Sequence, residues 1–437
     1  MSYERRILIR HSIASIIALA LFGISRFLYS IIISRKFGVE VLGSANSLIS
    51  QAFLIAMPLG FFAVALGKYS SEFLAREDFE KIKSMVSVSF SFPLIGILLA
   101  PLNMYLAVLS VLRAIQLTFR SFIYGIHKGE VYSYAMIIGF IPLFLSFYLD
   151  DPFLPYISLL STIAFFSFGY LIKNDLFGKP RREEFYLLLR YSSFAFLGTL
   201  SGVFLVQGPY FLSEKLGSAL IAGRVSASLS AAFLLTYLPQ VLQSAIMPIY
   251  SYKYGRADLN YVKLLAEKTT ELLSLFTAFV VFILLLIGKE VISFLFGFNL
   301  GEEFYIALIA VEIYIAYNPS IVALNSTKYV KEGSLISILG ALIALIAWIP
   351  SIKKFSEYGT MVGLLIGYMA ILVGTAYTSH KKLKISPKSY KPLLFAIPLQ
   401  LLVFISKTML FAGILLYGLA MKEEITESIK AFHGKGF

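Results

Sequence analysis

The sequence contains no cysteine, so disulfides, thiolate chemistry and cysteine-bound metals are excluded. Its four histidines (His11, His127, His380 and His433) lie far apart and do not have the spacing of metal ligands. Charged residues make up only 14% of the 437 residues, well below the roughly 25% of a typical soluble domain. These shortages exclude a thiol enzyme and a water-soluble protein of ordinary composition.

Hydrophobic residues, by contrast, make up 58% of the chain. Since one helical membrane crossing needs about 20 apolar residues, the chain has room for a dozen or more crossings. The apolar run after the opening MSYERRILIRHS is not followed by a small-residue cleavage site. We therefore expect it to be the first membrane helix rather than a removed signal peptide.

Apolar runs separated by charged or turn-forming clusters predict about fourteen transmembrane helices in an all-α, polytopic membrane protein. The last two runs are short and could form one tilted segment broken near Pro398 and Lys407. The predicted runs are 9–34, 44–67, 84–100, 103–126, 131–149, 154–172, 185–212, 218–247, 264–287, 303–327, 333–350, 358–378, 392–405 and 408–421.

The basic residues alternate between the two sides of this arrangement. With an even number of crossings both termini share a side, and the segments on that side hold 26 of the 38 lysines and arginines, against 7 in the opposite loops. Cytoplasmic loops are enriched in Lys and Arg. The alternation therefore predicts that both termini are cytoplasmic, and it supports the helix count.

Two stretches about 180 residues apart resemble each other, residues 35–78 and 214–258. Each opens with a Lys-x-Gly turn, continues into a Ser- and Ala-rich helix that contains proline, and ends in Tyr-Ser followed by Arg-x-Asp. Both copies begin outside and end inside. They therefore predict a parallel repeat, with two six-helix bundles followed by two C-terminal helices.

This organisation predicts five parts of the chain. They are an N-terminal six-helix bundle (1–173), a basic cytoplasmic linker (174–184), a C-terminal six-helix bundle (185–380), two appended helices (391–421) and a cytoplasmic tail (422–437).

Four segments resemble the multidrug/oligosaccharidyl-lipid/polysaccharide (MOP) exporter superfamily, and in particular its polysaccharide-transporter branch of Wzx-type lipid-linked oligosaccharide flippases. They are SRFLYSIIISRKFG (25–38), GSANSLISQAFLIAMPLGF (43–61), MPIYSYKYGRADLNYVKLL (247–265) and GKEVISFLFG (288–297). The resemblance implies two bundles around a central cavity that opens alternately to each side.

One segment departs from the pattern of the superfamily. Many relatives carry an acidic-basic pair late in the seventh helix, whereas residues 203–217 here contain no acid before Glu214. A role of that pair in ion coupling or domain contact is therefore in doubt for this chain.

Five arginines lie inside predicted helices, where a charge costs at least about 2.5 kcal/mol. Arg26 and Arg113 are the deepest. Arg113, Gln116 and Arg120 follow at i, i+3 and i+7, so they share one face of their helix. The other two are Arg190 and Arg224. Arg120, Arg190 and Arg224 lie near enough to a helix end to extend to the lipid headgroups instead.

The arginines outnumber the acids within helices, which predicts a cationic cavity. Arginine stays charged and binds phosphate oxygens through two parallel hydrogen bonds, which suits the phosphate or pyrophosphate between a lipid and its glycan. We expect substrate contacts from Arg26, Arg113, Gln116, Arg120, Arg224 and Asn318.

Glu312 is the main acid predicted within a helix. It could pair with an arginine to hold the bundles in one state, bind a proton or cation, or remain a neutral buried acid. We expect it to serve ion coupling or gating, with coupling to Na⁺ or H⁺ left open. No metal and no bound cofactor is expected.

The sequence therefore predicts a flippase that moves a lipid-linked oligosaccharide from the inner to the outer leaflet of the plasma membrane. We expect a monomer that contacts membrane lipids and no nucleic acid. The first alternative is an ion-coupled multidrug or cation antiporter of the same superfamily. Helix 1 argues against it, since it holds Arg26 and no acid. A membrane glycan ligase or transferase is a more distant alternative, because no loop exceeds about twenty residues.

Overall fold

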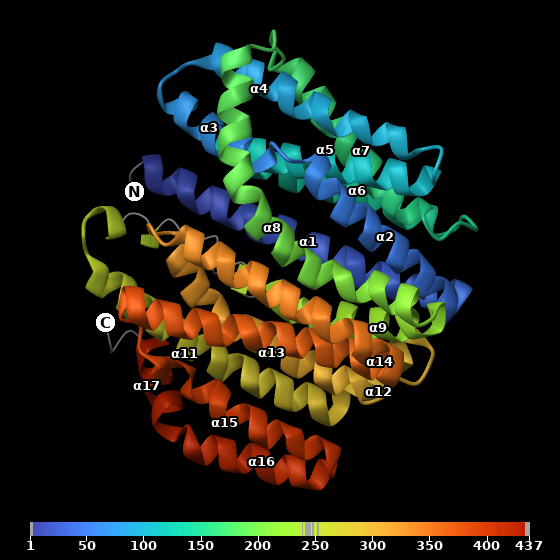
Figure 1. Cartoon of the computed structure of the whole chain (residues 1–437), viewed down its shortest axis with the longest axis vertical. Coiled ribbons are helices and arrows are strands. Elements are labelled where there is room, and N and C mark those ends of the chain that lie inside the picture. Colours follow the sequence, from blue (N-terminus) through green and yellow to red (C-terminus); the bar gives the residue numbers. More distant parts are fainter. Residues whose placement is uncertain (1–2, 238, 241–245, 247–248, 251–252, 433–437) are drawn as a thin grey trace. The chain divides into compact units, whose positions relative to one another are not determined.

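The computed structural model describes residues 3–237, 239–240, 246, 249–250 and 253–432, and every secondary-structure element in this part of the chain is helical (Figure 1). The chain divides into two compact units, Met1–Gly223 and Arg224–Phe437. The first contains α1 (Tyr3–Phe37), α2 (Val39–Leu59), α3 (Ala63–Ala75), α4 (Phe79–Ser91), η1 (Phe92–Leu99), α5 (Met104–Gly125), α6 (Gly129–Ser146), α7 (Leu154–Lys173) and α8 (Arg182–Leu216).

Helix α9 (Ala219–Ala232) crosses the boundary between the units. The second unit continues with η2 (Phe233–Thr236), α11 (Leu259–Ile283), η3 (Leu284–Gly288), α12 (Lys289–Phe296), α13 (Glu303–Asn325), α14 (Val330–Leu383), η4 (Pro387–Tyr390), α15 (Lys391–Gln400), η5 (Leu401–Phe404), α16 (Lys407–Ala420) and α17 (Lys422–Phe432).

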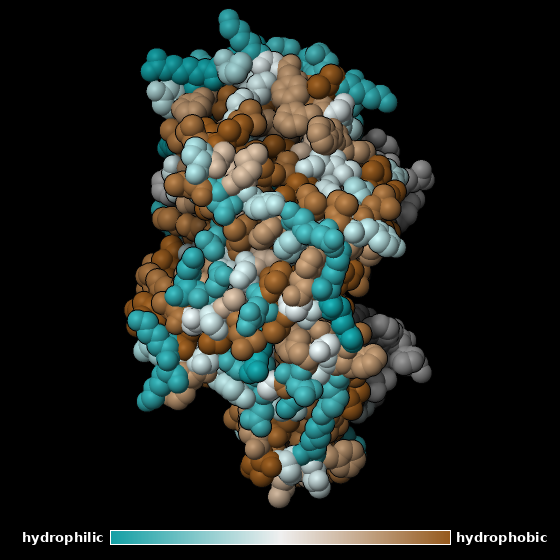
Figure 2. Space-filling view, turned by 90° about the vertical axis from the view of Figure 1, so that its right-hand side faces the viewer, coloured by the Kyte–Doolittle hydropathy of each residue, from teal (hydrophilic) through white to brown (hydrophobic). Residues whose placement is uncertain are grey.

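The expectation of an all-α, polytopic membrane protein is confirmed. Within the described residues, eleven helical spans are long and apolar enough to cross a membrane. Many large apolar side chains are exposed, for example Leu102 at 80% and Phe165 at 79%, and Figure 2 shows hydrophobic side chains over much of the visible face. A soluble protein rarely exposes so much contiguous apolar surface, so we assign these side chains to lipid.

Each of the fourteen predicted segments overlaps described helical residues, and the segment 44–67 crosses the turn at residues 60–62 that separates α2 from α3. The span Val330–Leu383 is two helices that meet at Ser356, whose φ of 55° and ψ of −127° break the helix. The two short C-terminal segments are separate helical stretches, since Ser406 begins α16 by accepting a hydrogen bond from the Met409 amide (3.1 Å). Residues 238, 241–245 and 247 of the predicted segment 218–247 lie outside the described residues.

The two repeat copies end in the same turn. Glu77 and Ala257 have positive φ angles of 57° and 59°. The aspartate after each of them begins the following helix, because Asp78 accepts from the Lys81 amide (3.3 Å) and Asp258 from the Tyr261 amide (3.1 Å). The shared Arg-x-Asp sequence therefore forms the same turn in both copies.

Helix α8 packs against α2, α3 and α4, so its contacts place it in the first unit. Aromatic pairs carry this packing, with ring centroids 5.7 Å apart for Phe62 and Phe185 and 5.8 Å apart for Tyr69 and Tyr191. The sequence assigned residues from 185 onward to the second bundle. The position of the boundary between the two functional bundles stays a prediction.

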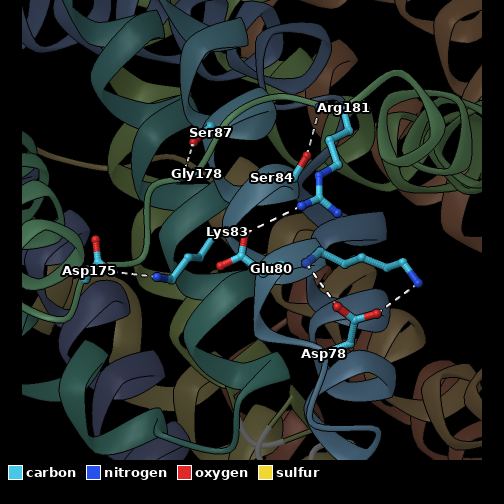
Figure 3. A network of polar contacts seen from close by, with 9 residues as sticks. Asp78, Glu80, Lys83, Ser84, Ser87, Asp175, Gly178 and Arg181 are labelled. Carbon is cyan, nitrogen blue, oxygen red and sulfur yellow. Dashed lines mark hydrogen bonds and ion pairs between the residues drawn. The ribbon is translucent and has the colours of Figure 1, made fainter.

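The first part of the predicted linker is a turn at residues 174–175 followed by a non-helical segment, 176–181, that lies along α4. Four polar contacts hold it there (Figure 3): Asp175 Oδ2 with Lys83 Nζ (2.5 Å), the Gly178 amide with Ser87 Oγ (3.0 Å), the Arg181 amide with Ser84 Oγ (2.9 Å), and the Arg181 guanidinium with Glu80 (3.5 Å). Gly178 lies so close to α4 that a Cβ there would be 2.7 Å from Lys83 Cβ. The predicted linker is therefore fixed to the first unit.

We predict that Gly178→Ala loosens the contact of this linker with α4. The added methyl group would overlap α4, and overpacking of this kind costs about 1–3 kcal/mol. Limited trypsin digestion should then cleave after Arg181 several-fold faster than in the native protein, whereas Lys179 precedes Pro180 and stays uncut. Gly169→Ala is the control, because nothing lies within 4 Å of its Cβ. Equal cleavage of both variants would contradict the docking.

Candidate functional site

Arg26 lies on α1 among three aromatic rings of the first unit. Its guanidinium carbon is 5.8 Å from the centroid of Phe53 on α2, 5.6 Å from Tyr156 on α7 and 5.0 Å from Tyr210 on α8. The rings are held in turn by other contacts, since Tyr156 also packs edge-on against Tyr29 (4.8 Å). Four helices therefore converge on one cation, which the electron-rich faces of the rings stabilise.

The polar contacts of Arg26 are few for a guanidinium. Its Nη2 donates to Ser50 Oγ (3.3 Å), and its Nη1 is buried with no hydrogen-bond partner. In the part of the chain that the structure describes, no carboxylate pairs with Arg26. An unsatisfied buried donor of a charged group is costly. This donor is therefore available to an anion that enters the site.

Arg113 on α5 lies next to the same aromatic group. Its guanidinium carbon is 4.5 Å from the centroid of Phe53 and 4.6 Å from that of Phe22. Phe53 thus contacts both arginines, and Phe22 stacks on Phe53 with centroids 6.4 Å apart. The two deepest arginines of the sequence are therefore brought to one place by tertiary packing.

Gln116 links Arg113 to α6. It is 1% exposed, its Oε1 accepts a hydrogen bond from Arg113 Nη1, and its Nε2 donates to the Tyr132 hydroxyl (2.8 Å). The predicted spacing of three residues thus corresponds to a real contact on one helix face. Arg120 on the same helix is half-buried, and Tyr132 lies within electrostatic range of both arginines. Arg190 is exposed, which agrees with a headgroup-facing side chain.

Arg224 has a different environment, in the second unit. Its Nη1 donates to Glu357 Oε1 (2.7 Å), and Glu357 follows the break at Ser356 in α14. The Arg224 side chain is 42% exposed and that of Glu357 is 10% exposed. An arginine neutralised by a buried carboxylate is a weaker anion site than Arg26, so the pair favours a structural role that fixes this turn.

The other two predicted site residues also lie in the second unit, on α13. Asn318 lines a small cavity of about 10 Å³, room for about one water molecule, together with Tyr250, Thr269 and Pro319. Glu312 is fully buried, and among the described residues it forms no ion pair. The structure thus brings together Arg26, Arg113, Gln116 and Arg120 in one unit, and it places Arg224, Asn318 and Glu312 in the other.

The sequence alone did not reveal the side chains that contact these charged residues. No pattern within one helix shows that Tyr29 and Tyr156 are completely buried. The sequence also gives no reason to pair Glu357, which follows Lys353 and Lys354, with Arg224. An excess of Tyr and Phe on helices that also carry buried arginines is the only signal in the sequence that could have suggested cation–π contacts.

Comparison with protein-family models gives no match, and comparison with curated proteins gives none either. Solved structures do match. One is an inward-facing multidrug resistance MATE family transporter of the MOP superfamily, with a TM-score of 0.66 and 13% identity over 85% of this chain and 94% of that one. Another is the lipid II flippase MurJ in an inward closed conformation, with a TM-score of 0.61 and 16% identity over 95% of this chain and 100% of that one.

A third match is a MOP superfamily transporter from Pyrococcus furiosus, with a TM-score of 0.58 and 14% identity over 86% of this chain and 95% of that one. The fold is that of the MOP superfamily transporters. The sequence-based expectation of this fold is confirmed. At these identities the similarity establishes the fold alone, and the matched structures include both a drug transporter and a lipid flippase, so the choice of substrate depends on the site.

We predict that Gln116→Leu destabilises the first unit. The change removes the amide that binds Arg113 and leaves the buried Tyr132 hydroxyl without its donor, which costs about 1–3 kcal/mol. Thermal unfolding in detergent should therefore begin several degrees lower. Gln51→Leu is the control, because Gln51 is only part-buried and donates to Ser47 on its own helix (3.2 Å). Equal loss in both variants would refute a special role of Gln116.

Proposed function

We propose that the protein is a flippase that moves a lipid-linked oligosaccharide, with a phosphate or pyrophosphate linkage, from the inner to the outer leaflet by alternating access. The observation that carries the proposal is the environment of Arg26. Its guanidinium is held by three rings and one hydroxyl, its Nη1 has no hydrogen-bond partner, and no described carboxylate neutralises it.

The chemistry of this site favours a phosphate group. A phosphate has several strong acceptor oxygens, and arginine presents paired N–H donors that match them. Arg113 beside it, on the shared ring of Phe53, adds a second positive charge. Two cations so close together repel each other in a medium of low dielectric. An anion between lipid and glycan would relieve that repulsion.

The aromatic rings around Arg26 are also compatible with an anionic substrate. Phe53, Tyr156 and Tyr210 stabilise Arg26 without supplying a negative charge that would compete with the phosphate. A carboxylate in the same place would repel the anion. The match to MurJ supports this interpretation, since MurJ is a lipid II flippase.

We further propose that the protein works in the plasma membrane as a monomer with both termini in the cytoplasm. The support is the alternation of basic loops, with 26 of the 38 lysines and arginines on the side of the termini.

We predict that Arg26→Ala abolishes most of the transport. Loss of a charge-assisted contact costs about 1.5–3 kcal/mol, or roughly tenfold to a hundredfold in transport rate. The assay expresses the chain in cells that lack their own flippase and measures delivery of glycan to the outer face. Arg113→Ala should impair transport as well, and Arg26→Lys should recover only part of it.

The matched control is Arg190→Ala, since Arg190 is exposed and should tolerate the change. Membrane expression of each variant is measured in parallel. Unchanged glycan delivery by both Arg26→Ala and Arg113→Ala would refute the cationic site.

The second candidate is an ion-coupled multidrug or cation antiporter. Buried Glu312 favours it, since among the described residues no cationic side chain forms an ion pair with this acid, and one matched structure is that of a multidrug resistance MATE family transporter. This function predicts drug efflux driven by Na⁺ or H⁺ that Glu312→Gln abolishes. Our proposal predicts no such efflux, measured as dye loss from cells that express the chain.

A further inference from the structure

The hydroxyl group of Tyr156 is buried and has no hydrogen-bond partner. Tyr156 is 0% exposed and lies in the first turn of α7. Its ring packs edge-on against the rings of Tyr29 (4.8 Å between centroids) and Phe53 (6.1 Å). Aromatic rings are weak acceptors of hydrogen bonds. Because buried polar groups in proteins nearly always have a partner, this hydroxyl needs an explanation.

Tyr29 shows how the neighbouring hydroxyl is satisfied. Tyr29 is also 0% exposed, but its hydroxyl donates to the carbonyl oxygen of Pro152 (2.8 Å) in the turn before α7. This bond ties α1 to the start of α7 and holds the Tyr29 ring against that of Tyr156. The two tyrosines are therefore in contact, and only the hydroxyl of Tyr156 lacks a partner.

The ring of Tyr156 has a role that does not need the hydroxyl. Its centroid is 5.6 Å from the guanidinium carbon of Arg26, and that of Phe53, which has no hydroxyl, is 5.8 Å from the same atom. A phenylalanine ring is therefore sufficient for the cation–π contact. Since an unsatisfied buried hydroxyl costs free energy, the Tyr156 oxygen destabilises the folded protein unless a ligand binds it.

Arg26 contributes a second unpartnered donor to the same group of side chains. Its Nη2 donates to Ser50 Oγ (3.3 Å), whereas its Nη1 is buried without a partner. The Arg26 guanidinium and the Tyr156 ring are in contact, so the two unpartnered donors belong to adjacent side chains. In the described part of the first unit, no carboxylate pairs with Arg26. The missing acceptor is thus not an acid of that unit.

We propose that the Tyr156 hydroxyl and Arg26 Nη1 together bind one phosphoryl group, the one that links lipid and glycan in the substrate. The assignment rests on the proposed function and adds Tyr156 to the substrate-binding residues. A phosphoryl group has several acceptor oxygens, so it can accept from both donors at once. Hydrogen bonds to an ionised acceptor are roughly twice as strong as those between neutral groups. The substrate would thereby offset the cost of the buried hydroxyl.

The first test measures stability without a ligand. Tyr156→Phe removes a hydroxyl that has no partner, so the unfolding temperature of the purified full-length protein should stay the same or rise by a few degrees. Tyr29→Phe breaks the bond to Pro152 and should lower it by a few degrees. Unfolding is followed in detergent by circular dichroism. An equal fall in both variants would overturn the proposal, since a water molecule would then already satisfy Tyr156.

The second test measures binding of geranyl phosphate to the same protein by isothermal titration calorimetry. Tyr156→Phe should raise the Kd about tenfold, the effect of losing one hydrogen bond to a charged group. Two further probes separate the parts of the ligand, since geraniol lacks the phosphoryl group and inorganic phosphate lacks the chain. Geranyl phosphate should bind more tightly than either. Equal affinity for inorganic phosphate would overturn the assignment to a lipid-linked substrate.

Tyr417→Phe is the matched control. Tyr417 lies in the second unit and is likewise 0% exposed with an unpartnered hydroxyl, so the change removes the same group away from Arg26. It should leave the Kd for geranyl phosphate unchanged. Arg26→Ala should abolish most of the binding, and Arg26→Ala combined with Tyr156→Phe should bind no more weakly than Arg26→Ala alone, because the two donors act on one group.

The failure of this proposal can be told apart from the failure of the proposed function. A native Kd in Tyr156→Phe, together with loss of binding in Arg26→Ala, would overturn the role of Tyr156 and leave the cationic site in place. A native Kd in Arg26→Ala would overturn both.

Discussion

Every charge within the membrane-spanning helices must be neutralised or solvated by the protein itself, because lipid does neither. This chain meets the requirement in three ways. Arg224 has a carboxylate partner in Glu357, Arg113 binds an amide and two rings, and Arg26 has three rings and a hydroxyl. The helices that meet at each arginine are thereby constrained to specific neighbours.

The choice of partner determines what each arginine can do. A carboxylate cancels the charge and fixes a position, as Glu357 does at the broken turn of α14. Aromatic faces stabilise the cation and leave its net charge unbalanced. Arg26 is therefore the side chain at which positive potential is kept, and an anion gains most there.

The same reasoning applies with opposite sign to Glu312. It lies on α13, most of whose residues are buried, and among the described residues no lysine, arginine or histidine forms an ion pair with it. The first unit thus keeps a positive charge at Arg26 that no described carboxylate balances, and the second holds at Glu312 a buried acid that no described cation balances.

Much of the fold could be predicted from the sequence, because the membrane imposes a simple rule on it. Apolar runs of about 20 residues must be helices, so the fourteen segments and the break between residues 350 and 358 followed from hydropathy alone. The repeated Arg-x-Asp turn was also visible, since an αL residue followed by an Asp N-cap is a local structure. Helical spacing likewise placed Arg113 and Gln116 on one face.

The partners of the buried charges were decided only by tertiary structure. Phe53, Tyr156 and Tyr210 come from three different helices, and Glu357 is 133 residues from Arg224. The sequence determined which side chains carry charge and at what depth they lie, because depth depends on distance along a helix. Which groups face those charges depends on how the helices rotate and pack, and no pattern local to one helix encodes that.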